Sequence, residues 1–300
     1  MSKIVYKEMR FRADSLALIE KVNQIIKEYH RQGYELTLRQ VYYQLVANGI
    51  IENKERSYKN LGSLISNARL AGLIDWNAIV DRTRFLRGFN YETSPEDAIK
   101  RLSQRYGTDP WAGQKNHVEV WVEKDALVDI VGQASNKLNV DYFSCRGYVS
   151  QSAMFRSARR LADWQLAGKD ITILHLGDHD HDPSGIDMSR DIEERLATFG
   201  IFPDVKRIAL NMDQVDEYTP VPNPTKLSDS RAADYISQFG YESWELDALQ
   251  PRIIDDLISG HINPLIDWDL MESVKEECEE ERRQLETVSY HWANIIAEYT

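Results

Sequence analysis

The sequence predicts an α/β protein in which a helical N-terminal region precedes a parallel β-sheet with helices on both faces. Between residues 117 and 210, short apolar segments alternate with helical segments, and this alternation is typical of a parallel sheet. Before residue 92, apolar residues recur at helical spacing instead. The 300 residues fit about two domains of roughly 150 residues each.

The N-terminal region predicts a DNA-binding fold. Its three helices are expected over residues 15–31, 38–47 and 58–71. Asp14 and Thr37 stand where N-caps of the first two helices belong. A basic stretch follows at residues 81–88. Three short helices and a basic extended segment are the order of a winged helix-turn-helix domain, in which the third helix and the wing approach DNA.

The remaining elements follow in order after a linker rich in Pro and Gly. Strands are expected over residues 117–123, 140–145, 171–177 and 205–210, and helices over 125–138, 151–167 and 184–199. Helices over 232–239, 248–258 and 270–299 complete the chain. The expected division is a tyrosine-containing DNA-binding domain (1–92), a linker (93–116), a sheet domain (117–265) and a C-terminal helix (266–300).

The charge of the chain is unevenly distributed. The net charge is −12, from 36 Lys and Arg against 48 Asp and Glu, yet residues 1–92 hold 15 basic and 10 acidic residues. A basic first third joined to an acidic remainder is compatible with DNA contact at one end. No apolar run reaches the ~18 residues of a membrane helix, and two cysteines give no disulfide framework. We therefore expect a cytoplasmic, nucleoid-associated protein with no membrane contact.

Carboxylates follow two of the predicted strands directly. One strand runs into Asp178, Asp180 and Asp182, and another ends in Glu123. Carboxylates crowded at one edge of a sheet repel each other, and a divalent cation relieves that repulsion. The sequence therefore predicts a Mg²⁺ site, with Mn²⁺ as a possible substitute. The alternative is that the aspartates only cap the helix expected to start near Ser184.

Three histidines are interleaved with these aspartates: His175, His179 and His181. Imidazole and carboxylate together can bind Zn²⁺ or Mn²⁺, so histidine ligation is a second alternative. The His-x-His-x-Asp-His order of binuclear hydrolases is absent.

Two adjacent tyrosines lie on the second predicted helix. On a helical wheel, Tyr42 falls inside the apolar arc, whereas Tyr43 falls outside it, one turn after Arg39. We expect Tyr42 in the core and the Tyr43 hydroxyl directed toward solvent or DNA. A phenol near a cation ionises more readily and is a better nucleophile. The alternative is that both tyrosines pack in the core or touch a backbone phosphate.

Three motifs together resemble one family. They read Arg39-Gln40-Val41-Tyr42-Tyr43, Val122-Glu123-Lys124 and Asp180-His181-Asp182-Pro183-Ser184-Gly185. In this order they resemble the A subunit of type IIB DNA topoisomerases (topoisomerase VI) and the related meiotic double-strand-break transesterase. The resemblance spans roughly residues 10 to 265. A compact, stand-alone A-like protein of bacterial or phage type is the description that fits this length.

The resemblance implies a winged-helix domain joined to a Toprim domain, a Rossmann-like parallel sheet that binds Mg²⁺. It implies that Tyr43 is the nucleophile that forms a 5′-phosphotyrosyl link, assisted by Arg39. It also implies that Glu123, Asp180 and Asp182 hold the metal, within a homodimer in which the tyrosine of one protomer works with the metal of the other.

The chain departs from the family pattern in three respects. Gln40 stands where the family has an acid, and Asp178 adds an aspartate that can replace Asp182 as a ligand. The chain is also short, and it contains no nucleotide-binding motif, so ATP-driven strand passage would need a separate B-type ATPase subunit.

Two other functions compete with transesterification. A Toprim nuclease would hydrolyse DNA with metal-activated water and leave Tyr43 a structural role. A non-catalytic DNA-binding module would use the basic residues alone. All three functions predict double-stranded DNA as the partner and phosphate contacts from four residues, Lys59, Arg82, Arg84 and Arg87.

Overall fold

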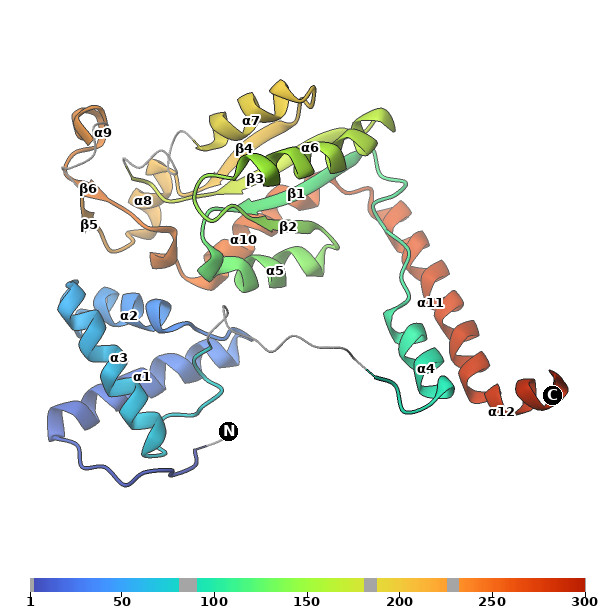
Figure 1. Cartoon of the computed structure of the whole chain (residues 1–300). Coiled ribbons are helices and arrows are strands. Elements are labelled where there is room, and N and C mark those ends of the chain that lie inside the picture. The colour runs from blue at the N-terminus through green and yellow to red at the C-terminus, as the bar shows by residue number, and fades with distance from the viewer. Residues whose placement is uncertain (1–2, 81–90, 181–187, 226–231, 300) are drawn as a thin grey trace.

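A four-stranded parallel sheet lies at the centre of the computed structural model, which describes residues 3–80, 91–180, 188–225 and 232–299 (Figure 1). Its strands are β1 (Asn116–Val122), β2 (Asp141–Ser144), β3 (Asp170–Leu176) and β4 (Asp204–Ala209). They lie in the order β2-β1-β3-β4, and each neighbouring pair is parallel. The predicted α/β class and all four predicted strands are confirmed.

Helices cover both faces of the sheet (Figure 1). The first layer holds α5 (Val128–Lys137) and α10 (Pro251–Ile262), and the second holds α6 (Gln151–Leu166) and α7 (Met188–Thr198). Successive side chains of β1 alternate between the layers, because side chains of a strand point to opposite faces in turn. Val118 and Val120 belong to the core beside α5 and α10, whereas Trp121 belongs to the core beside α6 and α7.

The segment after β4 returns to the edge of the sheet. It contains α8 (Met212–Tyr218), the strand pair β5 (Asn223–Pro224) and β6 (Glu242–Ser243), α9 (Ala232–Phe239) and the 3₁₀ turn η2 (Leu246–Ala248). His179, just beyond β3, exchanges two backbone hydrogen bonds with Trp244, of 2.8 and 2.9 Å between nitrogen and oxygen. These bonds bring the residues after β6 against the carboxyl end of β3.

The N-terminal region packs α1 (Ala13–Arg31), α2 (Leu38–Ala47) and α3 (Glu55–Leu70) around a core of its own. Helix α2 starts with a reciprocal cap. The Thr37 hydroxyl accepts from the Gln40 backbone N–H, and the Gln40 side chain accepts from the Thr37 N–H at 2.9 Å. Gln40 therefore closes the helix start at the position where the resembled family carries an acid. The predicted cap at Asp14 is wrong, because α1 begins at Ala13 and Asp14 lies in its first turn.

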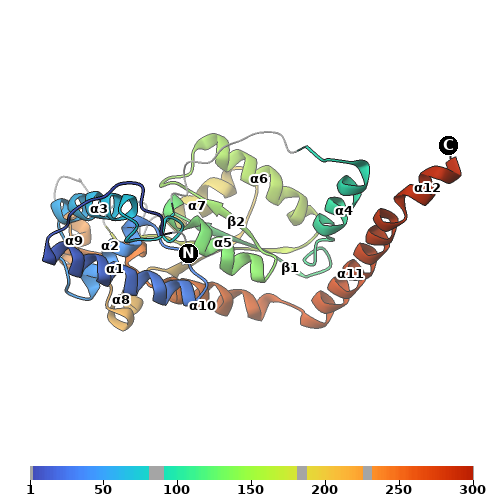
Figure 2. The ribbon, with the colours of Figure 1, turned by 90° about the horizontal axis from the view of Figure 1, so that it is seen from below.

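A helical arm extends from the sheet (Figure 2). It pairs α4 (Pro95–Arg105) with α11 (Trp268–Tyr290), and α12 (Trp292–Tyr299) continues beyond α11. The Tyr106 hydroxyl donates to the Glu281 carboxylate at 2.7 Å, which joins the two sides of the arm. Two expectations therefore change. The segment expected to be a linker contains α4, started by a Ser94 cap and Pro95, and the single C-terminal helix is interrupted at His291.

The base of the arm is tied where the chain enters and leaves the sheet region. The Gln114 side chain donates to the Asp267 carbonyl at 2.9 Å and accepts from the Asp267 N–H at 2.8 Å. Both cysteines, Cys145 and Cys278, are buried free thiols. Within the described ranges, no helix has the length and apolarity that crossing a membrane requires.

Candidate functional site

The carboxyl ends of β1 and β3 bring Glu123 and Asp178 together. The two strands are adjacent and parallel, so the residues that follow them emerge at one edge of the sheet. The Glu123 backbone N–H donates to the Leu176 carbonyl at 2.8 Å, and the Glu123 carboxylate accepts the Asp178 backbone N–H at 2.8 Å. The predicted convergence of strand-end carboxylates is thus found for this pair.

Asp178 is held at both of its carboxylate oxygens. One accepts the Leu246 backbone N–H at 2.8 Å, and the other lies 2.7 Å from the Lys124 ammonium nitrogen. Burial raises the pKa of Asp178, Lys124 lowers it, and the nearby charge of Glu123 raises it further. The net effect is a raised pKa, because burial, with the charge of Glu123, outweighs the attraction of Lys124.

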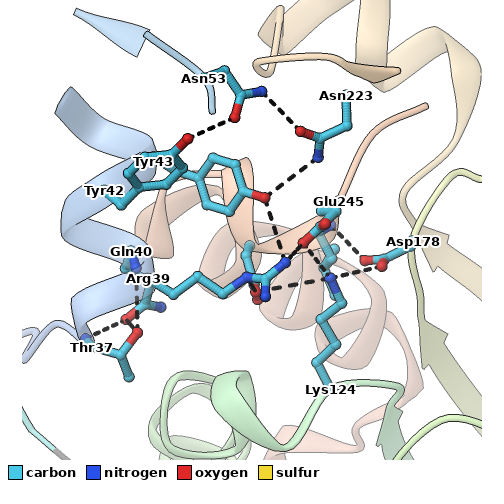
Figure 3. Close-up of polar contacts among 12 residues, drawn as sticks. Thr37, Arg39, Gln40, Tyr42, Tyr43, Asn53, Lys124, Asp178, Asn223 and Glu245 are labelled. Atoms are coloured by element: carbon cyan, nitrogen blue, oxygen red, sulfur yellow. Dashed lines mark hydrogen bonds and ion pairs between the residues drawn. The ribbon is translucent and has the colours of Figure 1, made fainter. Parts of the chain in front are cut away.

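Lys124 connects this pair to a second group of acids. Its ammonium nitrogen lies 2.8 Å from the Glu245 carboxylate and 3.8 Å from that of Asp247. Arg39, from α2, pairs with the same two acids, its Nε lying 2.8 Å from Asp247 while its Nη2 contacts Glu245 (Figure 3). Burial raises the pKa of Glu245, but Lys124 and Arg39 outweigh burial and lower it to about 2. Glu245 is therefore a carboxylate held between two cations.

Asp247 is the least satisfied member of the group. Its side chain is almost fully buried, and no described residue hydrogen-bonds either of its carboxylate oxygens. Its contacts with Arg39 and Lys124 are ion pairs that do not meet hydrogen-bond geometry. Burial raises the pKa of Asp247 despite these cations. A buried carboxylate without hydrogen bonds costs stability, so the charged form of Asp247 destabilises the fold.

Tyr43 lies on the other side of Arg39. Arg39 Nη2 donates to the Tyr43 hydroxyl at 3.5 Å, and the Asn223 side-chain amide donates to it at 3.4 Å (Figure 3). The expected neighbourhood of Tyr43 and Arg39 is found, but the expected exposure is wrong, since Tyr43 is only 4% exposed. Burial raises its pKa and the Glu245 charge adds to this effect, which outweighs Asn223 and Arg39. The phenol is therefore protonated at neutral pH.

Tyr42 is a core residue, as predicted. Its ring packs edge-on against Tyr43 and Tyr58, with centroid distances of 5.4 and 5.3 Å. Its hydroxyl donates to the Asn53 side chain at 2.9 Å, and the Asn53 amide donates to Asn223 at 2.8 Å. Asn53 and Asn223 thus link the N-terminal helices to the sheet region on one side of Tyr43, while Arg39 does so on the other.

Asp180 lies near Arg207 and Tyr235, on whose pKa values its negative charge acts. Burial lowers the pKa of Arg207 to about 10, although Glu123, Asp178 and Asp180 each favour its charged form. Arg207 also donates to the Asp178 backbone carbonyl at 2.6 Å. The Arg207 guanidinium therefore places a positive charge next to the acidic residues at this edge of the sheet.

Two of the interleaved histidines, His175 and His179, are each hydrogen-bonded to a hydroxyl group. His175 faces α7, where its Nδ1 lies 2.8 Å from the Ser189 hydroxyl, and His179 Nδ1 lies 3.0 Å from the Tyr235 hydroxyl. Burial, followed by the charge of Arg207, lowers the pKa of His175 to about 3 and that of His179 to about 4. Over the ranges that the structure covers, no three His, Cys, Asp or Glu side chains form a ligand group for a metal ion.

Several predicted residues lie outside the described ranges or away from the cluster. Asp182 and the third histidine, His181, are outside them, and so are Arg82, Arg84 and Arg87 of the basic stretch. Lys59 is exposed on α3, where its ammonium nitrogen lies 2.6 Å from the Glu55 carboxylate. Neither the metal set nor the DNA-contact set is therefore complete in the structure.

Five residues of the cluster were not predicted from the sequence: Lys124, Arg207, Asn223, Glu245 and Asp247. A signal existed for three of them. Lys124 directly follows the strand-end Glu123, and Glu245-Leu246-Asp247 repeats the alternation of acids seen after β3. Asn223 and Arg207 carry no such pattern. Comparison of the chain with protein-family models, with curated proteins and with solved structures found no match.

Proposed function

We propose that the protein is a topoisomerase VI A-like DNA transesterase, which cleaves duplex DNA through Tyr43 with the help of Toprim-bound Mg²⁺. One observation carries this proposal. A continuous series of contacts runs from Tyr43 through Arg39, Glu245 and Lys124 to Asp178 and Glu123. The candidate nucleophile and the strand-end carboxylates, which are far apart in sequence, therefore belong to one cluster.

The proposed step exchanges one ester bond for another. The Tyr43 oxygen attacks a backbone phosphorus, a tyrosyl O–P bond forms, and the P–O3′ bond breaks. The phenol gives up its proton, and the departing 3′ oxygen takes one to become a hydroxyl. Arg39, which already donates to the Tyr43 oxygen, would stabilise negative charge that develops on the phenol and on the phosphate.

The donor set fits Mg²⁺ in kind. Glu123 and Asp178 supply hard oxygen atoms beside each other at one edge of the sheet. We propose that they hold the ion together with Asp180 or Asp182. When bound, Mg²⁺ would neutralise phosphate charge during the transfer.

The remaining parts of the proposal follow the resemblance. The three N-terminal helices would act as a winged helix, with Lys59, Arg82, Arg84 and Arg87 on DNA phosphates, and the sheet as a Toprim domain. The homodimer of the resembled family joins the tyrosine of one protomer to the metal of the other. In this chain the contacts of Arg39 with Glu245 and Asp247 place Tyr43 beside the carboxylates of its own protomer, and the step proposed above uses that arrangement. Strand passage would still require a separate ATPase subunit.

A Toprim nuclease is the second candidate, and the state of Tyr43 favours it. The phenol is buried and its pKa is raised, as in a structural tyrosine. In that case water bound at the Glu123 edge would attack the phosphate, and Tyr43 would only pack against the cluster.

Incubation with supercoiled plasmid and Mg²⁺, followed by denaturation, separates the two candidates. The transesterase leaves protein attached to DNA 5′ ends, and Tyr43→Phe abolishes both the adduct and the cleavage. Tyr42→Phe is the matched control, since it removes a neighbouring hydroxyl that faces Asn53 instead. Cleavage that survives Tyr43→Phe without any adduct would establish the nuclease instead.

A further inference from the structure

The Glu245 carboxylate lies beside the Tyr43 hydroxyl, between two cations. A single oxygen, Oε2, contacts Arg39 Nη2 and also lies 2.8 Å from the Lys124 ammonium nitrogen. The same Arg39 nitrogen donates to the Tyr43 oxygen at 3.5 Å. The carboxylate and the phenol therefore share one donor, and whatever anion takes the place of Glu245 lies next to the Tyr43 oxygen (Figure 3).

The two cations do not depend on Glu245 for their positions. Arg39 Nε is held by Asp247 at 2.8 Å, and Lys124 is held by Asp178 at 2.7 Å. Around these two positive charges stand three acids, one of which has no hydrogen bond from a described residue. Without Glu245, Arg39 would keep its contact with Asp247 and Lys124 its contact with Asp178, so Glu245 can leave without releasing either cation.

We propose that Arg39 and Lys124 form a binding site for one DNA backbone phosphate, and that Glu245 occupies this site as an internal anion until DNA displaces it. This inference rests on the proposed function, whose reacting phosphate it locates. A carboxylate and a phosphodiester each carry one negative charge and two free oxygen atoms, so one can replace the other between an Arg and a Lys. The phosphorus would then lie beside the Tyr43 oxygen.

Glu245 would also act as a lock. While it pairs with Arg39 it helps join α2 to the sheet region. Displacement by DNA would break this link and place a phosphate, with the same single negative charge, beside the Tyr43 oxygen. Release of α2 from Glu245 and placement of the reacting phosphate would thus be one event.

The test measures binding of the full-length protein to a short fluorescent duplex, without divalent cations so that no cleavage occurs, between about 50 and 200 mM salt. Glu245→Gln removes the competing charge and is expected to tighten binding about tenfold. Glu242→Gln, which removes the same charge from an exposed neighbour on β6, is expected to leave affinity unchanged. Equal affinities of the two variants would overturn the proposal.

Lys124→Gln tests the other half of the site. Loss of one phosphate contact lowers the slope of log affinity against log salt by about 0.9. When combined with Lys124→Gln, Glu245→Gln is expected not to raise the affinity for the duplex, because the phosphate site then lacks one of its two cations. Tightening that persists would overturn the proposal. Thermal unfolding checks that each variant folds, and if Lys124→Gln does not fold, the comparison of Glu245→Gln with Glu242→Gln decides alone.

Three further outcomes separate this inference from free-phosphate binding and from the proposed function. If Glu245→Gln tightens binding of inorganic phosphate but not of duplex DNA, the site belongs to free phosphate and the inference fails. If Glu245→Gln tightens DNA binding but no protein–DNA adduct ever forms with Mg²⁺, the phosphate site stands and the transesterase does not. If an adduct forms but Glu245→Gln behaves like Glu242→Gln, the transesterase stands and the phosphate site does not.

Discussion

Two groups of buried acids lie within the sheet region and differ in how their charge is satisfied. Glu119, inside β1, is 1% exposed, and both of its oxygens are hydrogen-bonded. Arg160 donates to them at 2.9 and 2.8 Å, and the Trp121 indole donates at 2.8 Å. Asp247, beyond the carboxyl ends of the strands, is 2% exposed and lacks such bonds from the described residues.

The two acids consequently ionise differently. Burial raises the pKa of Glu119, but its bonds with His117 and Arg160 outweigh burial and lower it to about 2. For Asp247, burial wins and the pKa is raised. An acid whose lone pairs are all used stabilises the fold and has no capacity left for a ligand. An acid left without bonds among several cations marks the place where a ligand can change the balance of charge.

Glu123→Gln is expected to produce the largest functional effect. The amide oxygen can still accept the Asp178 N–H, so stability should change little, but the charge that would hold Mg²⁺ is lost. We expect the rate of Mg²⁺-dependent plasmid cleavage to fall about 100- to 1000-fold, or about 3 to 4 kcal/mol in the barrier. Cleavage at an unchanged rate would remove Glu123 from the site.

Glu119→Gln should show the opposite pattern. The amide leaves the Arg160 guanidinium without its counter-charge, and breaking a buried pair costs about 3 to 5 kcal/mol. Because the Arg160 side chain is 41% exposed, we expect about 3 kcal/mol in urea unfolding, with cleavage retained. Asp170→Asn, which breaks the exposed pair with Lys115, is the control and should cost less than about 1 kcal/mol.

The pH dependence of the free energy of unfolding tests the charge of Glu119. The pKa of Glu119 falls from an ordinary 4.5 to about 2 on folding, so its contribution is present above pH 4.5 and is lost as pH falls toward 2. Linkage makes this loss about 3 kcal/mol. The free energy of unfolding of the wild type should therefore decline more steeply over this range than that of Glu119→Gln. Parallel curves would contradict the assigned ionisation.

Asp247→Asn is expected to have a small effect of opposite sign. Removing a buried charge without hydrogen bonds should raise the free energy of unfolding by about 1 kcal/mol at neutral pH, because folding raises the pKa of Asp247. A loss of several kcal/mol would show that the ion pair with Arg39 is a structural bond like that of Glu119.

Lys59→Ala should have the smallest effect on stability. Lys59 pairs with Glu55, one helical turn before it, and both side chains are exposed. The free energy of unfolding should therefore change by less than about 0.5 kcal/mol. If Lys59 contacts a DNA phosphate, the salt slope of duplex binding should fall by about 0.9. Glu55→Gln, which frees Lys59 from the pair, should not lower that slope.

The sequence predicts the parts of this molecule that local pattern determines. Thr37 and the four strands follow from local signals, and Glu123 meets Asp178 because the carboxyl ends of parallel strands share an edge. Ser94 followed by Pro95 was an equally local start signal for α4, but the Pro and Gly content of the segment suggested a linker.

The parts that failed depend on contacts over long sequence separations. A helical wheel places Tyr43 relative to its own helix only, and Tyr43 is covered by residues such as Asn223 from a distant part of the chain. The pKa of Tyr43 fails for the same reason. The sequence places Arg39 near Tyr43, but it does not predict the burial or the Glu245 charge, which raise the pKa. Asp182 and the basic stretch remain predictions.

The paired hydrogen bonds between Gln114 and Asp267 have a mechanical consequence. They join the segment that enters the sheet region from α4 to the segment that leaves it for α11, so tension between the arm and the sheet passes first through this junction. The strands between the two residues are bypassed. A load on the arm would therefore shear one amide from one backbone group before it pulled on the edge where Glu123 and Asp178 lie.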